Sequence, residues 1–87
     1  MPEARYRIEI HVHAARDLRS LDDRTRAKIR KKIDSLAHDP RPQGCRKLRG
    51  SENTYRIRIG DHRVLYQIED AVVLVVVVRV GHRREVY

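Results

Sequence analysis

The chain opens with an alternation of polar and apolar residues that predicts a half-buried strand. Residues 6–12 read YRIEIHV, and alternation of this kind places every second side chain on the same side of a strand. The side chains that share the apolar side are Tyr6, Ile8, Ile10 and Val12. We therefore expect residues 6–12 to form the first strand of a sheet.

Farther along, apolar residues recur every three or four positions, which is typical of amphipathic helices. The first series is Ala14, Leu18 and Leu21, and the second is Ile29, Ile33 and Leu36. These series predict two helices that form a hairpin. Asp22 or Asp23 is the expected N-cap of the second helix, because its carboxylate can accept from the first free amides. Pro40 is expected to end that helix by disfavouring helical backbone at Asp39.

The second half of the chain predicts short strands joined by turns. Residues 40–45 form a connection, residues 46–50 a short strand and residues 51–53 a turn. An antiparallel meander then follows, in which Gly60-Asp61 and a region near Asp70 are the turns. Its strands are residues 54–59, 62–69 and 72–81.

The valine-rich last strand completes the predicted fold. Its run AVVLVVVV lacks alternation, so we expect a central strand that is covered on both faces. The predicted class is α+β, with an N-terminal strand, a helical hairpin and an antiparallel meander, and with the helices packed on one face of the sheet. At 87 residues, the chain is expected to form one domain over residues 1–87.

Charge narrows the choice of partners. The chain has 20 Lys and Arg against 12 Asp and Glu, a net charge of +8. Such a balance favours nucleic acid first, an acidic protein second and a membrane surface third. The longest apolar run is too short to span a bilayer and no signal peptide is apparent, so we expect a soluble protein. Cys45 is the only cysteine, which excludes an intramolecular disulfide and fits a reduced cytoplasm.

The predicted hairpin gathers arginines on one face. A two-residue turn at Gly60-Asp61 fixes the pairing of the flanking strands. The predicted pairs are Ile59 with His62, Arg58 with Arg63, Ile57 with Val64, and Tyr55 with Tyr66. Directly opposed like charges cost some tenths of a kcal/mol. A bound anion would compensate for the opposition of Arg58 and Arg63, and so would a neighbouring carboxylate.

The end of the chain adds candidate catalytic and phosphate-binding groups. His82 is a candidate general acid or base, Arg83 a phosphate clamp, and Tyr87 a stacking or proton-transfer group. A polar terminus without function is the alternative. His11, His13 and His38 lack the spacing of metal ligands, and we expect neither a metal nor another cofactor.

Two segments resemble the RelE/ParE superfamily of bacterial and archaeal toxins, and RelE most closely. These segments are LRGSENTYRIRIGDHRVLYQI and VVLVVVVRVGHRREVY. The resemblance implies a helical hairpin against an antiparallel sheet, in agreement with the periodicity. It also implies a ribosome-dependent, metal-independent endoribonuclease that cuts messenger RNA in the decoding site, where the RNA 2′-hydroxyl attacks the adjacent phosphate.

The resemblance also implies roles for individual residues and partners. The predicted catalytic residues are Arg63, Arg83, Tyr87 and His82. The residues predicted to bind the RNA backbone are Arg56, Arg58, Arg49 and Lys47. Arg56 and Arg58 lie where family members often carry lysines. The implied partners are the ribosome, its messenger RNA and an acidic, RelB-like antitoxin, with operator DNA bound only through the antitoxin complex.

Two other functions remain open on the sequence. A ParE-like toxin has the same fold but inhibits DNA gyrase by binding, and an inactive module would bind RNA or antitoxin without cleavage. The joint presence of Arg63, Arg83 and Tyr87 favours the nuclease.

Overall fold

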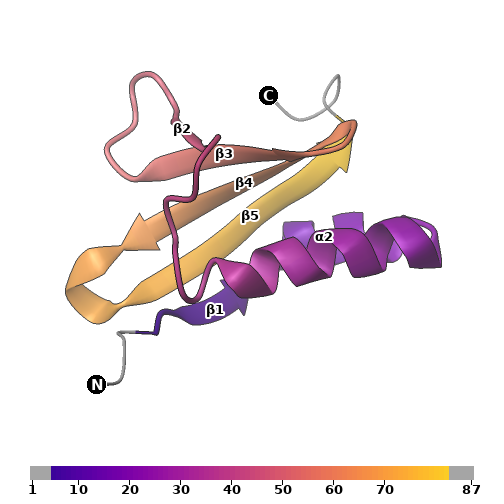
Figure 1. Cartoon of the computed structure of the whole chain (residues 1–87), viewed down its shortest axis with the longest axis horizontal. Coiled ribbons are helices and arrows are strands. Elements are labelled where there is room, and N and C mark those ends of the chain that lie inside the picture. The colour runs from indigo at the N-terminus through magenta and orange to yellow at the C-terminus, as the bar shows by residue number, and fades with distance from the viewer. Residues whose placement is uncertain (1–4, 83–87) are drawn as a thin grey trace.

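A computed structural model describes residues 5–82 as two α-helices and one five-stranded mixed sheet. The helices are α1 (Val12–Arg19) and α2 (Asp23–Ser35), and a short 3₁₀ turn, η1 (Asp70–Val72), precedes the last strand. The strands are β1 (Arg7–Ile10), β2 (Arg46–Lys47), β3 (Thr54–Ile59), β4 (His62–Glu69) and β5 (Leu74–His82). Their order across the sheet is β1-β5-β4-β3-β2 (Figure 1). The predicted α+β class is confirmed.

The first strand is shorter than the alternation predicts. The chain leaves the strand at His11, whose extended backbone makes it the N-cap of α1 and whose Nδ1 accepts from the amide of His13 at 3.2 Å. Val12 is therefore the first residue of α1, and it is 59% exposed. The prediction that Val12 belongs to the apolar side of a strand was wrong, because a histidine cap supplied a helix start that periodicity does not reveal.

The start of α2 was predicted and its end was not. Asp22 is the N-cap, and its Oδ2 accepts from the amide of Thr25 at 3.2 Å. The helix ends at Ser35, well before Pro40. The amides of Leu36 and Ala37 bond to carbonyls three residues earlier, at 3.0 and 3.2 Å. The last turn therefore tightens before the proline is reached. Within residues 5–82, no helix is long and apolar enough to cross a membrane.

The sheet combines the predicted meander with a parallel pairing that was not predicted. The register of β3 and β4 matches the prediction at every pair named above. β5 lies between β4 and β1, and β1 runs parallel to it. β5 lies inside the sheet with a strand on each side, which confirms the predicted placement of the valine strand, although the third of the five strands is β4.

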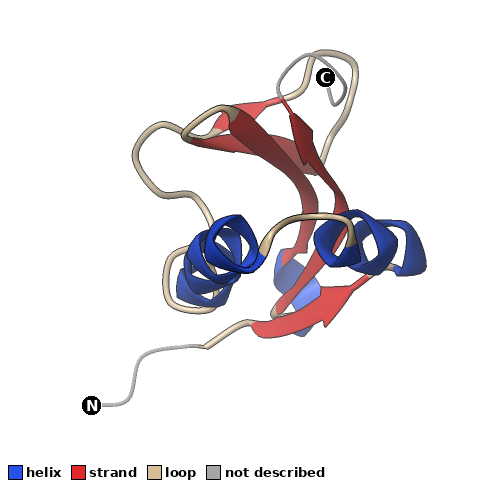
Figure 2. Ribbon diagram, turned by 90° about the vertical axis from the view of Figure 1, so that its right-hand side faces the viewer, coloured by secondary structure: helices blue, strands red, loops and turns tan. Residues whose placement is uncertain are grey.

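One face of the twisted sheet and both helices share a single core (Figure 2). Its helical members include Ala14 and Leu18 from α1 and Ile29 and Ile33 from α2. The core residues of the strands are Ile57, Val64, Tyr66, Ile68, Val75, Val77 and Val80. On the other face of β5, Leu74, Val76 and Val78 are only partly buried. The valine strand is thus fully covered on one face and not on both.

A β-bulge between β4 and β5 changes which residues of β5 face the core. Leu65 pairs with Arg79 but Tyr66 pairs with Val77, so Val78 has no partner of its own in β4. Val77 before the bulge and Val80 after it are both buried. The extra residue shifts the alternation by one position, and Arg79 consequently faces outward in an otherwise apolar strand.

A hydrogen-bonded network of Arg41, Asp70 and Tyr6 joins the N-terminal segment to the sheet. The Arg41 guanidinium donates to both oxygens of Asp70, at 2.8 and 3.3 Å, and the Tyr6 hydroxyl donates to Oδ1 of Asp70 at 2.7 Å. The hydrogen bond from Arg41 is the main cause that lowers the pKa of Asp70, and the bond to Asp70 raises the pKa of Tyr6. Arg41 also lies over the Tyr55 ring, 5.2 Å from its centroid. This network holds the end of the sheet remote from the Gly60-Asp61 turn.

Candidate functional site

The β3–β4 hairpin turns a row of arginines away from the core. Arg58 pairs with Arg63, and the next residues along each strand, Ile57 and Val64, pair with each other. Ile57 is 3% exposed and Val64 is fully buried. Because successive side chains of a strand point to opposite faces, the two arginines lie on the face opposite the core, as predicted.

A second row widens this face to neighbouring strands. Arg56 pairs with Arg46 of β2 on one side and with Leu65 on the other, and Leu65 pairs in turn with Arg79 of β5. We define the arginine face as the five residues Arg46, Arg56, Arg58, Arg63 and Arg79. It is an open, cationic sheet surface whose guanidinium groups come from four strands.

Arg79 is the member of the arginine face for which residues 5–82 supply an ion pair. The Arg79 Nε donates to Oδ2 of Asp17 in α1 at 2.8 Å, and the same oxygen accepts from the Val80 amide at 2.9 Å. By contrast, Arg46 and Arg58 make no ion pair within residues 5–82. Arg58 therefore has no carboxylate partner in the described part of the chain, and its exposed guanidinium can bind an anionic ligand.

Two predicted site residues lie on the other side of the sheet. Lys47 pairs with Tyr55, whose neighbours along β3 face outward, so alternation directs Lys47 away from the arginine face. His82 is adjacent to Gly81, the partner of Arg63, and it pairs with His62. The two imidazole centroids are 5.8 Å apart in an edge-to-face contact. The register thus separates His82 from Arg63, with which it was predicted to act.

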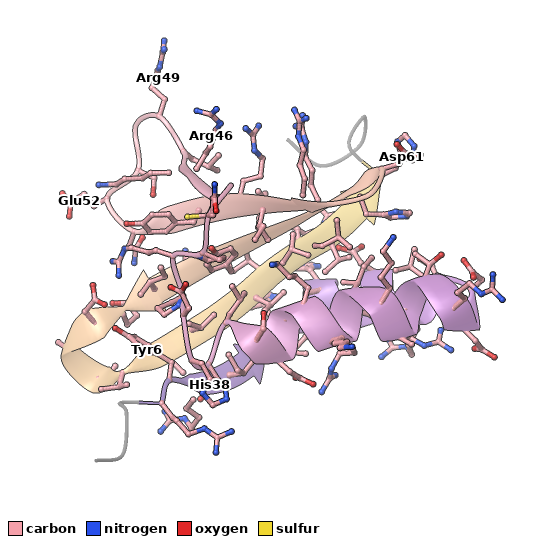
Figure 3. All side chains as sticks on the ribbon, viewed as in Figure 1. Tyr6, His38, Arg46, Arg49, Glu52 and Asp61 are labelled. Atoms are coloured by element: carbon pink, nitrogen blue, oxygen red, sulfur yellow. The ribbon has the colours of Figure 1, made fainter. Side chains whose placement is uncertain are left out.

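The remaining predicted residues fall in two groups. Arg49 is exposed in the connection between β2 and β3, and Figure 3 shows its side chain and that of Arg46 directed away from the helices. Arg83 and Tyr87 lie outside the described residues, so their predicted roles stay predictions.

The sequence did not identify Arg46 and Arg79 as residues of the site. Arg46 is next to Lys47 in a strand of two residues, where the sequence does not show which of the pair shares a face with Arg56. Arg79 was detectable as the single charge within the valine run. Its outward direction depends on the bulge, for which the sequence gives no signal.

The arginine face is suited to binding phosphate esters. A guanidinium presents two parallel N–H donors that match two phosphate oxygens, and it stays protonated at all working pH values. No group of three His, Cys, Asp or Glu side chains that could hold a metal occurs within residues 5–82. The residues described here therefore offer fixed positive charge, which can bind a polyanion and stabilise developing negative charge on a phosphate.

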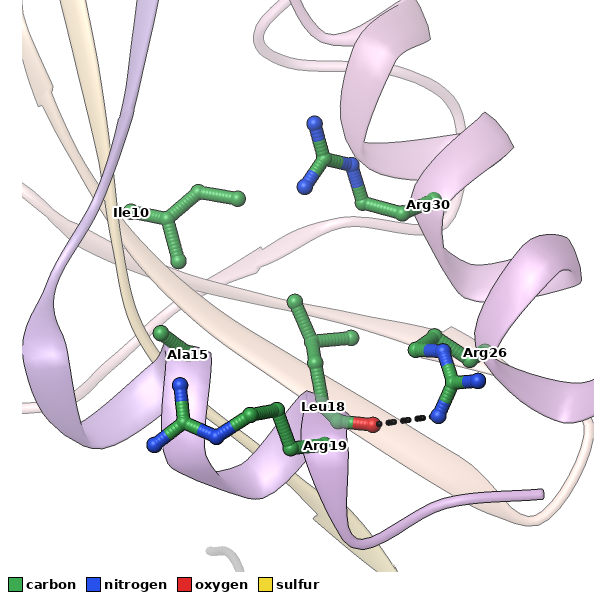
Figure 4. A pocket seen from close by; sticks show the side chains of 6 residues that line it. All are labelled: Ile10, Ala15, Leu18, Arg19, Arg26 and Arg30. Carbon is green, nitrogen blue, oxygen red and sulfur yellow. Dashed lines mark hydrogen bonds between the residues drawn. The ribbon is translucent and has the colours of Figure 1, made fainter. Parts of the chain in front are cut away.

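Two hollows lined by described residues lie away from this face. One, of about 260 Å³, is lined by residues of β1 and the two helices (Figure 4). Ile10, Ala15 and Leu18 provide its apolar wall, and Arg26 donates to the Leu18 carbonyl at 3.4 Å. Since this hollow contains no pair of groups suited to acid–base chemistry, it is a structural gap in the helical hairpin.

Comparison with known proteins gives consistent matches over most of the chain. The family model described as the ParE toxin of type II toxin–antitoxin system, parDE, matches residues 8–87. The mRNA interferase toxin RelE of Escherichia coli is 33% identical over 86 residues, covering 94% of this chain and 90% of that protein. The putative toxin RelE1 of Methanocaldococcus jannaschii is 30% identical over 76 residues, covering 82% and 84%.

A solved structure agrees with these sequence matches. The chain superposes with a TM-score of 0.83 on a chain of the toxin–antitoxin complex RelBE2 from Mycobacterium tuberculosis. The two sequences are 31% identical, and the match covers 94% of this chain and 95% of that one.

Proposed function

The chain belongs to the RelE/ParE superfamily of type II toxins, and from this premise we propose that it is an endoribonuclease toxin that cleaves messenger RNA on the ribosome. The observation that carries the proposal is the arginine face. Arg58 is opposed to Arg63 beside Arg56 and Arg46, and such a concentration of guanidinium groups favours a bound polyanion.

The proposed reaction needs positive charge and two proton transfers. The RNA 2′-oxygen forms a bond to the adjacent phosphorus, and the bond from phosphorus to the 5′-oxygen breaks, leaving a 2′,3′-cyclic phosphate and a 5′-hydroxyl. Arg63 and Arg83 would stabilise the charge that develops on the phosphate, while Arg56 and Arg58 hold the backbone in line. With guanidinium groups in this role, the reaction requires no metal.

The proton that leaves the 2′-hydroxyl and the proton that reaches the 5′-oxygen need other groups. An arginine remains protonated and cannot serve as the base. Tyr87 lies in the same predicted motif as Arg83, and it is our candidate for orienting the reacting groups or transferring a proton. Groups of the ribosome are the other possible proton donors and acceptors. His82 is the weaker candidate, because alternation directs it away from Arg63.

The proposed partners follow from the charge and the relatives. A net charge of +8 suits an acidic antitoxin, and the related RelBE2 structure is a toxin–antitoxin complex. We propose a RelB-like antitoxin that binds this chain, and operator DNA that is contacted only through that complex. The ribosome and its messenger RNA place the proposed activity in the cytoplasm.

Primer extension on a defined messenger in a purified translation system tests the proposal. Wild type is compared with Arg83→Ala and Tyr87→Phe, each checked for native folding by circular dichroism. We expect cuts inside the decoding site that weaken in both variants. Lys47→Ala is a matched control that removes a cation from the other side of the sheet and should cut normally. Absence of cuts by the folded wild type would overturn the proposal.

The family model that matches the chain is that of ParE, which favours gyrase inhibition as the second candidate. A ParE-like toxin acts by binding and needs no catalytic arginine. Toxicity that survives Arg83→Ala in a folded protein, together with inhibited DNA supercoiling, would select this candidate over the nuclease.

A further inference from the structure

The edge of β5 is uncovered beyond the end of β1. β1 pairs with β5 as far as Val77, whose carbonyl accepts from the His11 amide at 2.8 Å. The chain then enters α1, so residues 78–82 of β5 have no strand on this side in the described part of the chain. Val80 in this stretch is only 2% exposed, and a buried backbone amide needs a hydrogen-bond partner.

Asp17 of α1 supplies that partner. Its Oδ2 accepts from the Val80 amide at 2.9 Å and from the Arg79 Nε at 2.8 Å. The Asp17 side chain is 18% exposed, whereas the carboxylates of the other ion pairs within residues 5–82 are at least 53% exposed. Ala14 and Leu18 of the same helix are buried in the core. Their packing holds the Asp17 carboxylate against the edge of β5.

The bond to Asp17 determines where the Arg79 guanidinium lies. Arg79 starts on the same face as Arg56, because it pairs with Leu65 and Leu65 pairs with Arg56. The residues of α1, however, pack against the core face of the sheet. The Arg79 side chain therefore reaches Asp17 past the uncovered edge of β5, and its guanidinium is drawn to the margin of the arginine face.

Asp17 also balances the charge of Arg79. The ion pair has no net charge, and a phosphate that approached this guanidinium would be repelled by the carboxylate beside it. Displacement of Asp17 by a phosphate is disfavoured as well, because a carboxylate that is 18% exposed would lose its charged partner without becoming fully hydrated. Arg46 and Arg58 differ, since they make no ion pair within residues 5–82.

From these contacts we propose that Asp17 is a positioning residue that ends the RNA-binding surface at β5. It holds Arg79 at the strand edge in a neutral pair, and so limits phosphate contacts to the arginines of β2, β3 and β4. RNA affinity is thereby lower by about one phosphate contact than the five arginines together would allow. The inference rests on the proposed function, because it takes the arginine face as the surface that binds RNA.

Two other roles of Asp17 would give different results. If Asp17 orients Arg79 toward a bound phosphate, loss of the carboxylate charge weakens RNA binding. If Asp17 only satisfies the Val80 amide, RNA binding does not respond to the charge of Asp17. The three roles share the contacts of the free protein but differ in the direction of the effect on RNA binding.

Asp17→Asn separates these roles. Asparagine keeps an oxygen that can accept from the Val80 amide, but it removes the charge that holds Arg79. Fluorescence anisotropy measures the binding of a labelled uridine decamer that is 2′-O-methylated and resists cleavage. The slope of log affinity against log salt concentration should be steeper than in wild type by about 0.7, a fall in affinity about 2.6-fold larger over a fourfold rise in salt. A slope that is unchanged or shallower would overturn the proposal.

Two matched variants show whether Asp17 acts through Arg79. Asp34→Asn removes an equal charge from the exposed pair with Arg30 on α2, and it should leave the slope as in wild type. The double variant Asp17→Asn with Arg79→Ala removes the neutral pair as a unit, and it should return the slope to the wild-type value. Equal steepening in Asp34→Asn, or a double variant with a slope shallower than that of wild type, would contradict the proposal.

NMR of the unaltered protein makes the test independent of whether the variants fold. The Nε–H signal of Arg79 should keep its chemical shift when the decamer is added, because the bond to Asp17 persists. The Nε–H signals of Arg46 and Arg58 should move. A shift of the Arg79 signal together with the other two would overturn the proposal.

Failure of this inference can be distinguished from failure of the proposed function. If wild type does not bind the decamer, the proposed RNA-binding surface is wrong and the inference fails with it. If wild type binds and Arg46→Ala weakens binding, but Asp17→Asn has no effect on the slope, only the inference about Asp17 fails.

Discussion

Arg46 and Lys47 offer a sharp test of which side of the sheet binds RNA. They are adjacent, exposed and equally charged, and together they make up β2. Arg46 pairs with Arg56 and Lys47 with Tyr55, so alternation directs one to the arginine face and the other away from it. Replacing each in turn by alanine removes the same charge from the same strand but from opposite sides.

The expected effect can be calculated from counterion release. Each phosphate neutralised on a single-stranded nucleic acid contributes about −0.7 to the slope of log affinity against log salt concentration. Arg46→Ala should therefore make the slope shallower by about 0.7. Over a fourfold rise in salt, the affinity of wild type should fall about 2.6-fold more than that of the variant. Lys47→Ala should leave the slope unchanged.

Fluorescence anisotropy measures the slope with a labelled uridine oligonucleotide whose 2′-hydroxyls are methylated, so that it cannot be cleaved. Titrations between about 50 and 200 mM salt cover the range in which such contacts dominate. Thermal unfolding of both variants confirms that the fold is intact. If Lys47→Ala reduces the slope as much as Arg46→Ala does, the assignment of RNA binding to the arginine face is refuted.

Three further predictions concern stability. Tyr66→Phe removes the buried hydroxyl that donates to the Pro40 carbonyl at 2.8 Å; the loss should be about 1 kcal/mol, a fall in Tm of roughly 4–8 °C by calorimetry, and an unchanged Tm would contradict it. The folded pKa of Asp70 is lowered, first by the Arg41 hydrogen bond, so its stabilisation is present above the unfolded pKa of about 3.9 and is lost as pH falls through the folded value. Asp70→Asn should accordingly lower Tm at neutral pH and weaken the dependence of Tm on pH below about pH 4. An unchanged dependence of Tm on pH in this range would exclude the linkage. Val73 has a φ of 53°, a strained value for a β-branched residue, and Val73→Gly should stabilise the fold by about 1 kcal/mol in urea unfolding; destabilisation would argue against strain.

Local rules predicted those parts of the fold that local chemistry determines. The two-residue turn at Gly60-Asp61 fixes the β3–β4 register, and the opposition of Arg58 and Arg63 follows directly from that register. The Asp22 N-cap followed in the same way from the placement of one carboxylate. In both cases the determining residues lie within a few positions of the feature.

Features set by distant segments could not be predicted. The parallel pairing of β1 with β5 depends on where the helical hairpin returns the chain, and the bulge opposite Leu65 depends on how two strands fit over one core. The register of β4 and β5 beyond the bulge decides that Arg79 faces outward and that His82 is directed away from Arg63. The arginines of the hairpin were therefore predicted as site residues, whereas Arg46 and Arg79 at the margins of the site were not.

The pairing of β1 with β5 has a consequence for how the protein is made. β5 is the only strand that pairs with β1 within residues 5–82, and it is the last of the described elements to emerge during synthesis. The N-terminal strand must therefore wait, without a partner, until nearly the whole chain has been translated. Non-local pairing of this kind delays folding, so a chain whose synthesis stops before β5 cannot close the sheet and would be open to proteolysis.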